Sequence, residues 1–117
     1  MANHNEIGRL GEQLAVDYLL KHSYVILEQN WRIGRLEIDI IVQKNDVLIF
    51  VEVKTLTNSD YPEQAVHLQK QKLIVAAAEQ YLEKNNWINS IRFDIIAINI
   101  SNNKHNVHHI IDAFFEK

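Results

Sequence analysis

Residues 36–54 read LEIDIIVQKNDVLIFVEVK, which is two apolar, β-branched runs separated by the polar loop 44–46. Runs of this kind predict strands over 36–43 and 47–54 that pair as a hairpin. Three charged side chains interrupt or end the runs, namely Asp39, Glu52 and Lys54. Burying a lone carboxylate or ammonium costs several kcal/mol unless the group is paired or binds a metal ion. The stretch therefore predicts a hairpin with a polar site, and two carboxylates beside a lysine suit the hydrolysis of a phosphodiester.

Strand alternation indicates which of these side chains can meet. Asp39 shares a face of its strand with Glu37, and Glu52 shares a face of the next strand with Lys54. If the two strands pair through the short loop, Asp39 can lie near Glu52. Glu12 lies at the edge of the apolar stripe of an expected N-terminal helix, so it would reach over the same face of the sheet.

The whole chain predicts an α/β fold in which helices flank a mixed sheet, in the order α-β-β-β-α-β-β. The second helix is expected to begin near Asp60, Pro62 and Glu63, which suit a capped first turn. The predicted elements are a helix over 4–21, a strand over 24–31, a turn at 32–35, the hairpin, a loop at 55–60, a helix to about residue 84, a strand over 91–100 and a short edge strand over 106–112. The expected core positions of the two helices are Ile7, Leu10, Leu14 and Tyr18, then Ala65, Val66, Leu73, Ala77, Tyr81 and Leu82.

Composition favours one ordinary globular domain over residues 1–117. The chain is 47% hydrophobic and 23% charged, and it has no cysteine, so disulfides and thiolate metal sites are excluded. No apolar run approaches the ~18 residues that a membrane span needs, and residues 1–6 lack the basic and apolar pattern of a signal peptide, so none is expected. A cytoplasmic protein is therefore expected.

The charge balance argues against a general nucleic-acid binder. The net charge is -3 and the sequence pI is about 6.0, whereas such binders usually carry a basic face. A local basic rim is still expected, because carboxylates that serve a metal ion lower the net charge. The residues expected to form this rim and bind nucleic acid are Arg9, Arg32, Arg35, Lys70 and Lys72.

Short motifs occur in order over nearly the whole chain. They are GRLGE at 8–12, NWR at 30–32, EID at 37–39, FVEVK at 50–54, KQ at 70–71, RFD at 92–94 and DAF at 112–114. In this combination the chain resembles the YraN family, a bacterial group of small endonuclease-like proteins similar to archaeal Holliday-junction resolvases. The resemblance implies a restriction-endonuclease-like fold with a PD-(D/E)xK site. Asp39 then takes the aspartate position, residues 52–54 the ExK position and Glu12 that of a first-helix glutamate. Leu36 and Leu56 stand where the family usually has Gly and Arg.

Hard-cation chemistry then suggests a role for each residue. Mg²⁺ or Mn²⁺ prefers oxygen ligands, which the Asp39 and Glu52 carboxylates and the Val53 carbonyl would supply. Lys54 would position the attacking water or stabilise the developing negative charge. Glu12 would hold a second ion or a water bound to the first.

Plainer interpretations remain open at this stage. Asp39 and Glu52 can simply form ion pairs with Lys54 or Arg35 at the strand ends. Two classes of function follow, a metal-dependent DNA endonuclease acting on branched DNA in repair or recombination, and a non-catalytic module that binds nucleic acid or protein. RNA is a third, weaker choice of substrate, and the resolvase resemblance implies a homodimer.

Other polar groups have interpretations that do not involve a site. Asp94 is expected to cap a strand end or to pair with Arg92. His105, His108 and His109 lack the thiolates and the i,i+4 register of familiar zinc sites, so a solvated tail is expected there.

Overall fold

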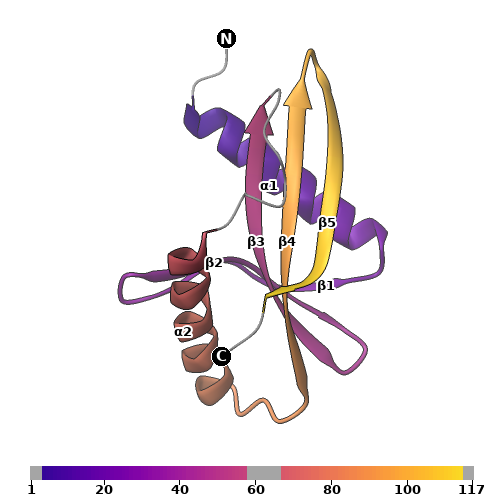
Figure 1. Cartoon of the computed structure of the whole chain (residues 1–117). Helices are drawn as coiled ribbons and strands as arrows, with labels where there is room; N and C mark the ends of the chain where they lie inside the picture. Colours follow the sequence, from indigo (N-terminus) through magenta and orange to yellow (C-terminus); the bar gives the residue numbers. More distant parts are fainter. Residues whose placement is uncertain (1–3, 58–66, 115–117) are drawn as a thin grey trace.

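The computed structural model describes residues 4–57 and 67–114, in which two helices pack on one five-stranded sheet (Figure 1). The elements are α1 (His4–Lys21), β1 (Val25–Ile33), β2 (Leu36–Lys44), β3 (Val47–Thr57), α2 (Leu68–Lys84), β4 (Ser90–Ser101) and β5 (Lys104–Phe114). The α-β-β-β-α-β-β order and the mixed sheet flanked by helices are therefore confirmed. Neither of these two helices is long and apolar enough to cross a membrane.

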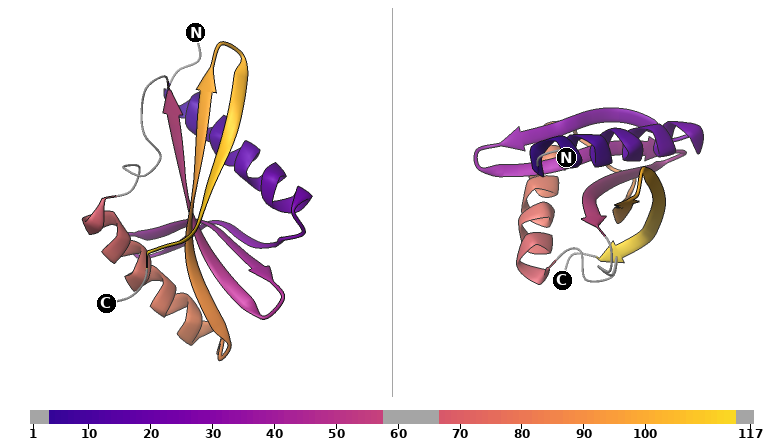
Figure 2. Two further views of the ribbon diagram at one scale, coloured as in Figure 1. Left: turned by 45° about the vertical axis from the view of Figure 1, so that its right-hand side comes forward. Right: turned by 90° about the horizontal axis from the view of Figure 1, so that it is seen from above.

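The five strands lie side by side in sequence order. Neighbouring strands are antiparallel except β3 and β4, which are parallel. A parallel pair needs a long crossover connection, and α2 lies within that connection. The sheet is strongly twisted, so that β1 and β2 run nearly crosswise to the upper parts of β3, β4 and β5 (Figure 2). The β2–β3 hairpin therefore links the two halves of the sheet.

Each helix covers its own apolar cluster. Beneath α1 the cluster contains Ala15, Val16 and Leu19 together with residues of β2, β3 and β4. Around α2 a second cluster contains Ala77 and Tyr81 together with residues of β2, β3, β4 and β5. The central strands are thus covered on both faces, which explains why their sequences are almost continuously apolar.

The helices bury somewhat different faces from those predicted. In α1 the buried residues are Gly11, Ala15, Val16 and Leu19, whereas Leu10 is 49% exposed, so its prediction as a core residue was wrong. Small residues let this helix approach the sheet closely, and the larger Leu10 lies outside the contact.

In α2 the predicted burial of Ala77 and Tyr81 is confirmed, and Ile74 and Ala78 complete the buried face. Leu73, predicted as core, is 44% exposed. The predicted helix start at 60–63 and the core positions Ala65 and Val66 lie outside the described residues.

Several strands are longer than predicted. β1 continues to Ile33, so Arg32 belongs to a strand, and the turn is confined to Gly34 and Arg35. β3 continues to Thr57 through residues predicted as loop, because it pairs with β4 over its whole length. β5 is an eleven-residue strand rather than a short edge piece. Pairing partners distant in sequence set these lengths, and local propensity does not reveal them.

A buried polar network ties β4 to β5. The Asp94 carboxylate is fully buried and accepts bidentate hydrogen bonds from the Arg92 guanidinium at 2.8 and 2.9 Å. The predicted pairing with Arg92 is therefore confirmed. His109 contributes a contact of 2.7 Å from its Nε2 to Asp94, and its Nδ1 lies 3.0 Å from the Tyr18 hydroxyl. The expectation of a solvated histidine tail was thus wrong for His109, although His105 and His108 are exposed.

Candidate functional site

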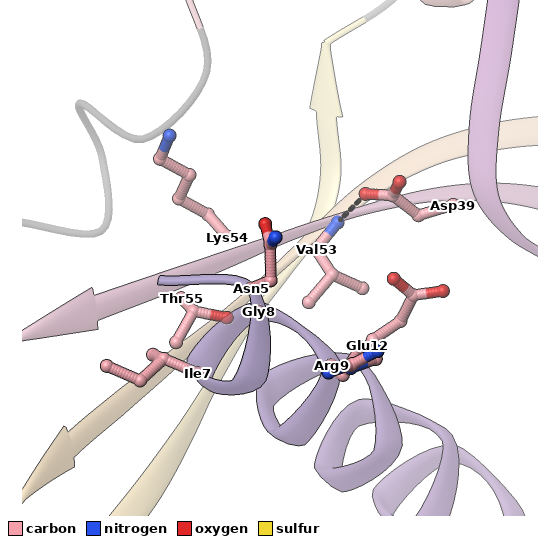
Figure 3. A pocket seen from close by; sticks show the side chains of 9 residues that line it. All are labelled: Asn5, Ile7, Gly8, Arg9, Glu12, Asp39, Val53, Lys54 and Thr55. Carbon is pink, nitrogen blue, oxygen red and sulfur yellow. Dashed lines mark hydrogen bonds between the residues drawn. The ribbon is translucent and has the colours of Figure 1, made fainter. Parts of the chain in front are cut away.

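The end of the β2–β3 ladder brings two predicted carboxylates together. The pairing of the two strands runs up to Ile40 opposite Val51, so Asp39 and Glu52 follow directly beyond this pair. The Val53 backbone N–H donates a hydrogen bond of 2.9 Å to Asp39 Oδ2, as Figure 3 shows. The Asp39 side chain thus accepts a hydrogen bond from the β3 backbone at the point where the β2–β3 pairing ends.

Glu52 is the most perturbed titratable group of the site. The residue as a whole is 8% exposed, and its side chain hydrogen-bonds the Asp39 carboxyl. Burial in the first place, and then the negative charge of Asp39, raise the pKa of Glu52 to about 8. Two carboxyl groups can hydrogen-bond only when one carries a proton, so the metal-free pair shares a proton near neutral pH.

Glu12 reaches the same place from α1. Gly11 allows this approach, because a Cβ at that position would overlap the Thr55 hydroxyl on β3. The Glu12 side chain points toward Asp39 (Figure 3). Burial first, and then the charge of Asp39, raise the pKa of Glu12, while a hydrogen bond with the Asn30 side chain lowers it. Glu12 therefore reaches over the same face of the sheet as Asp39, as its place on the helical wheel predicted.

An open pocket of about 550 Å³ lies between the start of α1 and the end of β3. Its walls are formed by Asn5, Ile7, Gly8, Arg9, Glu12, Asp39, Val53, Lys54 and Thr55 (Figure 3). Lys54 is exposed and extends away from Asp39 and Glu12. The expected convergence of Lys54 with the carboxylates of the hairpin is thus only partial, because Lys54 and Asp39 line one pocket but the Lys54 side chain extends away from Asp39. Strand twist turns the end of β3 away from Asp39, which the i,i+2 rule for a flat strand ignores.

The predicted basic rim is only partly assembled. Arg9 lines the pocket, whereas Lys54 and not Lys70 is the lysine there. Lys70 Nζ instead lies 3.7 Å from Glu52 Oε2. Arg32 pairs with Glu37 at 2.8 Å, so this arginine neutralises a carboxylate next to the site. The other two predicted residues, Arg35 and Lys72, are exposed at the β1–β2 turn and on α2 and do not line the pocket.

The donor set fits a hard divalent cation. Asp39, Glu52 and Glu12 offer carboxylate oxygens, which suit Mg²⁺ or Mn²⁺ better than softer metals. Among the described residues, no three His, Asp or Glu side chains converge closely enough to enclose an ion. Two carboxylates completed by water are nevertheless the usual protein share of a magnesium site. Val53 lines the pocket, and its carbonyl oxygen is the backbone atom that could bind the ion, because an amide N–H does not bind cations.

Three residues of the site were not predicted from the sequence. Asn5 and Thr55 line the pocket, and Asn30 hydrogen-bonds Glu12 from the edge strand β1. Asn30 has a positive φ of 51°, and Asn tolerates this conformation better than most residues. Its place in the NWR motif was the signal that could have identified it.

Comparison with known proteins identifies the family of the chain. A family model described as "Uncharacterised protein family UPF0102" matches residues 11–98. The chain belongs to the UPF0102 family. It is 43% identical over 117 residues to the UPF0102 protein of Flavobacterium psychrophilum, covering 98% of each chain. It is 44% identical to that of Bacteroides thetaiotaomicron, covering 98% of this chain and 97% of the relative. The UPF0102 protein of Dictyoglomus thermophilum is 46% identical over 102 residues, 85% of this chain and 86% of its own length.

The family predicted from the motifs, under the name YraN, is thereby confirmed. The UPF0102 match spans Glu12, Asp39, Glu52, Lys54 and Lys70, but it begins after Asn5 and Arg9. Among solved structures, "The structure of Pyrococcus Furiosus SfsA in complex with Ca2+" is similar at 13% identity with a TM-score of 0.38. That similarity covers 92% of this chain and 62% of the other.

Proposed function

We propose that this member of the UPF0102 family is a metal-dependent DNA endonuclease of the PD-(D/E)xK type. The observation that carries the proposal is the Asp39–Glu52 carboxyl pair, held at the end of the β2–β3 ladder beside Glu12 and an open pocket. A strongly perturbed carboxyl group beside a cleft is characteristic of a functional site, and Glu52 is such a group. The reaction class, phosphodiester hydrolysis, comes from the resemblance of the sequence motifs to the endonuclease-like YraN family.

The chemistry assigns a task to each residue. Asp39 and Glu52 would hold Mg²⁺ or Mn²⁺, and a bound ion would withdraw charge from the scissile phosphate. Glu12 would accept a hydrogen bond from the attacking water and take its proton. The water oxygen forms a bond to phosphorus as the bond to the leaving oxygen breaks, and solvent protonates the leaving oxygen.

Arg9 and Lys54 are placed to bind a flanking phosphate on the open side of the pocket. Both line it, and the Lys54 ammonium points outward, where a flanking phosphate of the strand would lie. Cations in this place bind the phosphate backbone and do not read the bases. Lys54 would thus act on the substrate at a distance from the carboxyl pair.

The experiment is a cleavage assay on duplex, flap and four-way DNA and on an RNA duplex, with Mg²⁺ or Mn²⁺ and with a chelator. We expect cleavage of a DNA substrate by the wild type only with the ion. Asp39→Asn should lower the rate by about a hundredfold or more, because it removes one of the two charged ligands. Asp46→Asn, in the exposed turn of the same hairpin, is the matched control and should leave the rate unchanged.

Binding without cleavage by the wild type would contradict the proposal and favour the second candidate, a non-catalytic module. The observation that favours that candidate is the outward orientation of Lys54, together with the net charge of -3. Preference for four-way DNA, and a two-fold dimer measured by sedimentation, would narrow the proposal to a resolvase, because two symmetric cuts need two sites. Cleavage of the RNA duplex alone would assign the substrate to RNA.

A further inference from the structure

The ammonium of Lys70 contacts Glu52 of the carboxyl pair from outside the hairpin. Lys70 lies in the first turn of α2, and its Nζ is 3.7 Å from Glu52 Oε2. The Glu52 side chain is 10% exposed, whereas that of Lys70 is 48% exposed. One partner of this ion pair is therefore fixed in the interior, and the other can move into solvent.

Lys70 meets a concentration of negative charge. The carboxylates of Asp39 and Glu37 both act on Glu52, and Asp39 also acts on Glu12. The neighbouring Arg32 is already paired with Glu37 at 2.8 Å. Lys54 extends away from Asp39 and Glu12 (Figure 3). Lys70 is thus the cation that reaches Glu52 from another element of the fold.

We propose that Lys70 is the resident counter-cation of the Asp39–Glu52 pair, and that a divalent cation must displace its ammonium to bind there. The proposal rests on the metal site of the proposed function. An ammonium and a divalent ion on the same carboxylate repel each other at close range. The flexible four-carbon stem of Lys70 lets the ammonium leave without moving α2. Once displaced, it lies beside the ion, where it can pair with a substrate phosphate.

In this arrangement Lys70 and Lys54 have different functions, although both lie near the site. Lys70 would hold the site charge-balanced in the metal-free protein and weaken the binding of the ion alone. Substrate would relieve this competition, because its phosphate offers the displaced ammonium a new partner. Loading of the ion would then be coupled to the arrival of a phosphodiester.

The test is calorimetric titration with Mg²⁺ in the absence of nucleic acid, at low ionic strength and about pH 9. This pH lies above the pKa of about 8 for Glu52, so proton competition is small. Lys70→Met should bind Mg²⁺ about three- to tenfold more tightly than the wild type, as expected for loss of a partly exposed competing cation. Lys72→Met is the matched control, since Lys72 is an exposed lysine of the same helix, and it should bind as the wild type does.

A second pair of titrations establishes that the effect passes through Glu52. In a Glu52→Gln background, Lys70→Met should change the affinity by less than about twofold, because the competed charge is gone. Unchanged or weaker binding by Lys70→Met in the native background would overturn the proposal, as would absence of Mg²⁺ binding by both proteins. An equal gain in both backgrounds would also overturn it, because the effect would then not depend on Glu52.

Failure of the counter-cation role can be distinguished from failure of the proposed endonuclease function. If Lys70→Met tightens Mg²⁺ binding through Glu52 but the wild type cleaves no nucleic acid, the counter-cation role stands and the endonuclease proposal fails. If the wild type cleaves DNA and Lys70→Met leaves Mg²⁺ affinity unchanged, the endonuclease proposal stands and the counter-cation role fails.

Discussion

Replacing Glu52 by Gln should change how stability depends on pH. The folded protein holds a proton on Glu52 up to about pH 8, whereas an unfolded chain releases it near the ordinary value of 4.5. Between these two values the folded state therefore binds more protons than the unfolded state. Stability must then fall as the pH rises through this window, and it levels off above pH 8.

The size of the effect follows from the same two values. Each pH unit inside the window changes the free energy of unfolding by about 1.4 kcal/mol, so Glu52 accounts for roughly 5 kcal/mol between its two limits. The proton is shared with Asp39, so this free energy belongs to the pair. Gln can keep a hydrogen bond to Asp39 without titrating. Glu52→Gln should therefore match the wild type near pH 5 and exceed its stability by a few kcal/mol near pH 9.

Chemical denaturation at intervals from about pH 5 to pH 9, with a chelator present, measures this difference. Glu83→Gln, an exposed glutamate on α2, is the control and should follow the wild-type curve. The informative quantity is the difference between variant and wild type, because it removes the contribution of every group that the two proteins share. Parallel curves for Glu52→Gln and the wild type would refute the account of a buried, proton-sharing pair.

Two further predictions concern the elements that position the site. Gly11→Ala should destabilise the fold by about 1–3 kcal/mol in thermal or chemical unfolding, because its Cβ would overlap Thr55 and push α1 off β3. Gly8→Ala, which meets no atom within 4 Å, should be neutral or slightly stabilising. Asp94→Asn should cost about 3 kcal/mol, because it leaves the Arg92 guanidinium without its charged partner in a largely buried place.

The control for the last substitution is Asp112→Asn. Asp112 is exposed and has a positive φ of 56°, which Asn also tolerates, so we expect little change in stability. Burial alone would raise the pKa of Asp94, but hydrogen bonds from His109, Arg92 and the Asp112 N–H lower it below its ordinary value. An Asp94→Asn protein as stable as the wild type would show that these bonds contribute no net stability.

The local pattern of apolar and polar residues was sufficient to predict the order of helices and strands. The apolar runs of 36–54, divided by a polar loop, predicted the hairpin that the structure contains. The helix over 4–21 and its glutamate at the stripe edge were also predicted, because helical periodicity reports which side chains face the sheet. Strand ends were predicted less well. The pairing of β3 with β4 runs on to Thr57, and only the partner strand determines that.

Interactions between distant segments account for the features that sequence reasoning missed. His109 was expected in solvent, yet it is buried against Asp94 and Tyr18, which belong to two other elements. Asn30 meets Glu12 only because β1 packs beside α1. Each of these side chains is ordinary in its local context. Its partner becomes apparent only when the elements are packed.

The two lysines show why proximity along the chain is an incomplete guide to a site. Lys54 is two residues from Glu52, and alternation on a flat strand would place both on one face. The sheet instead twists strongly, and the Lys54 side chain lines the open pocket and extends away from Asp39. Lys70, from the start of α2, brings a positive charge to within 3.7 Å of Glu52 Oε2. The ExK triplet predicted that Lys54 would supply positive charge to the carboxylates. In the structure Lys70 of α2 supplies this charge to Glu52, whereas Lys54 lines the open pocket.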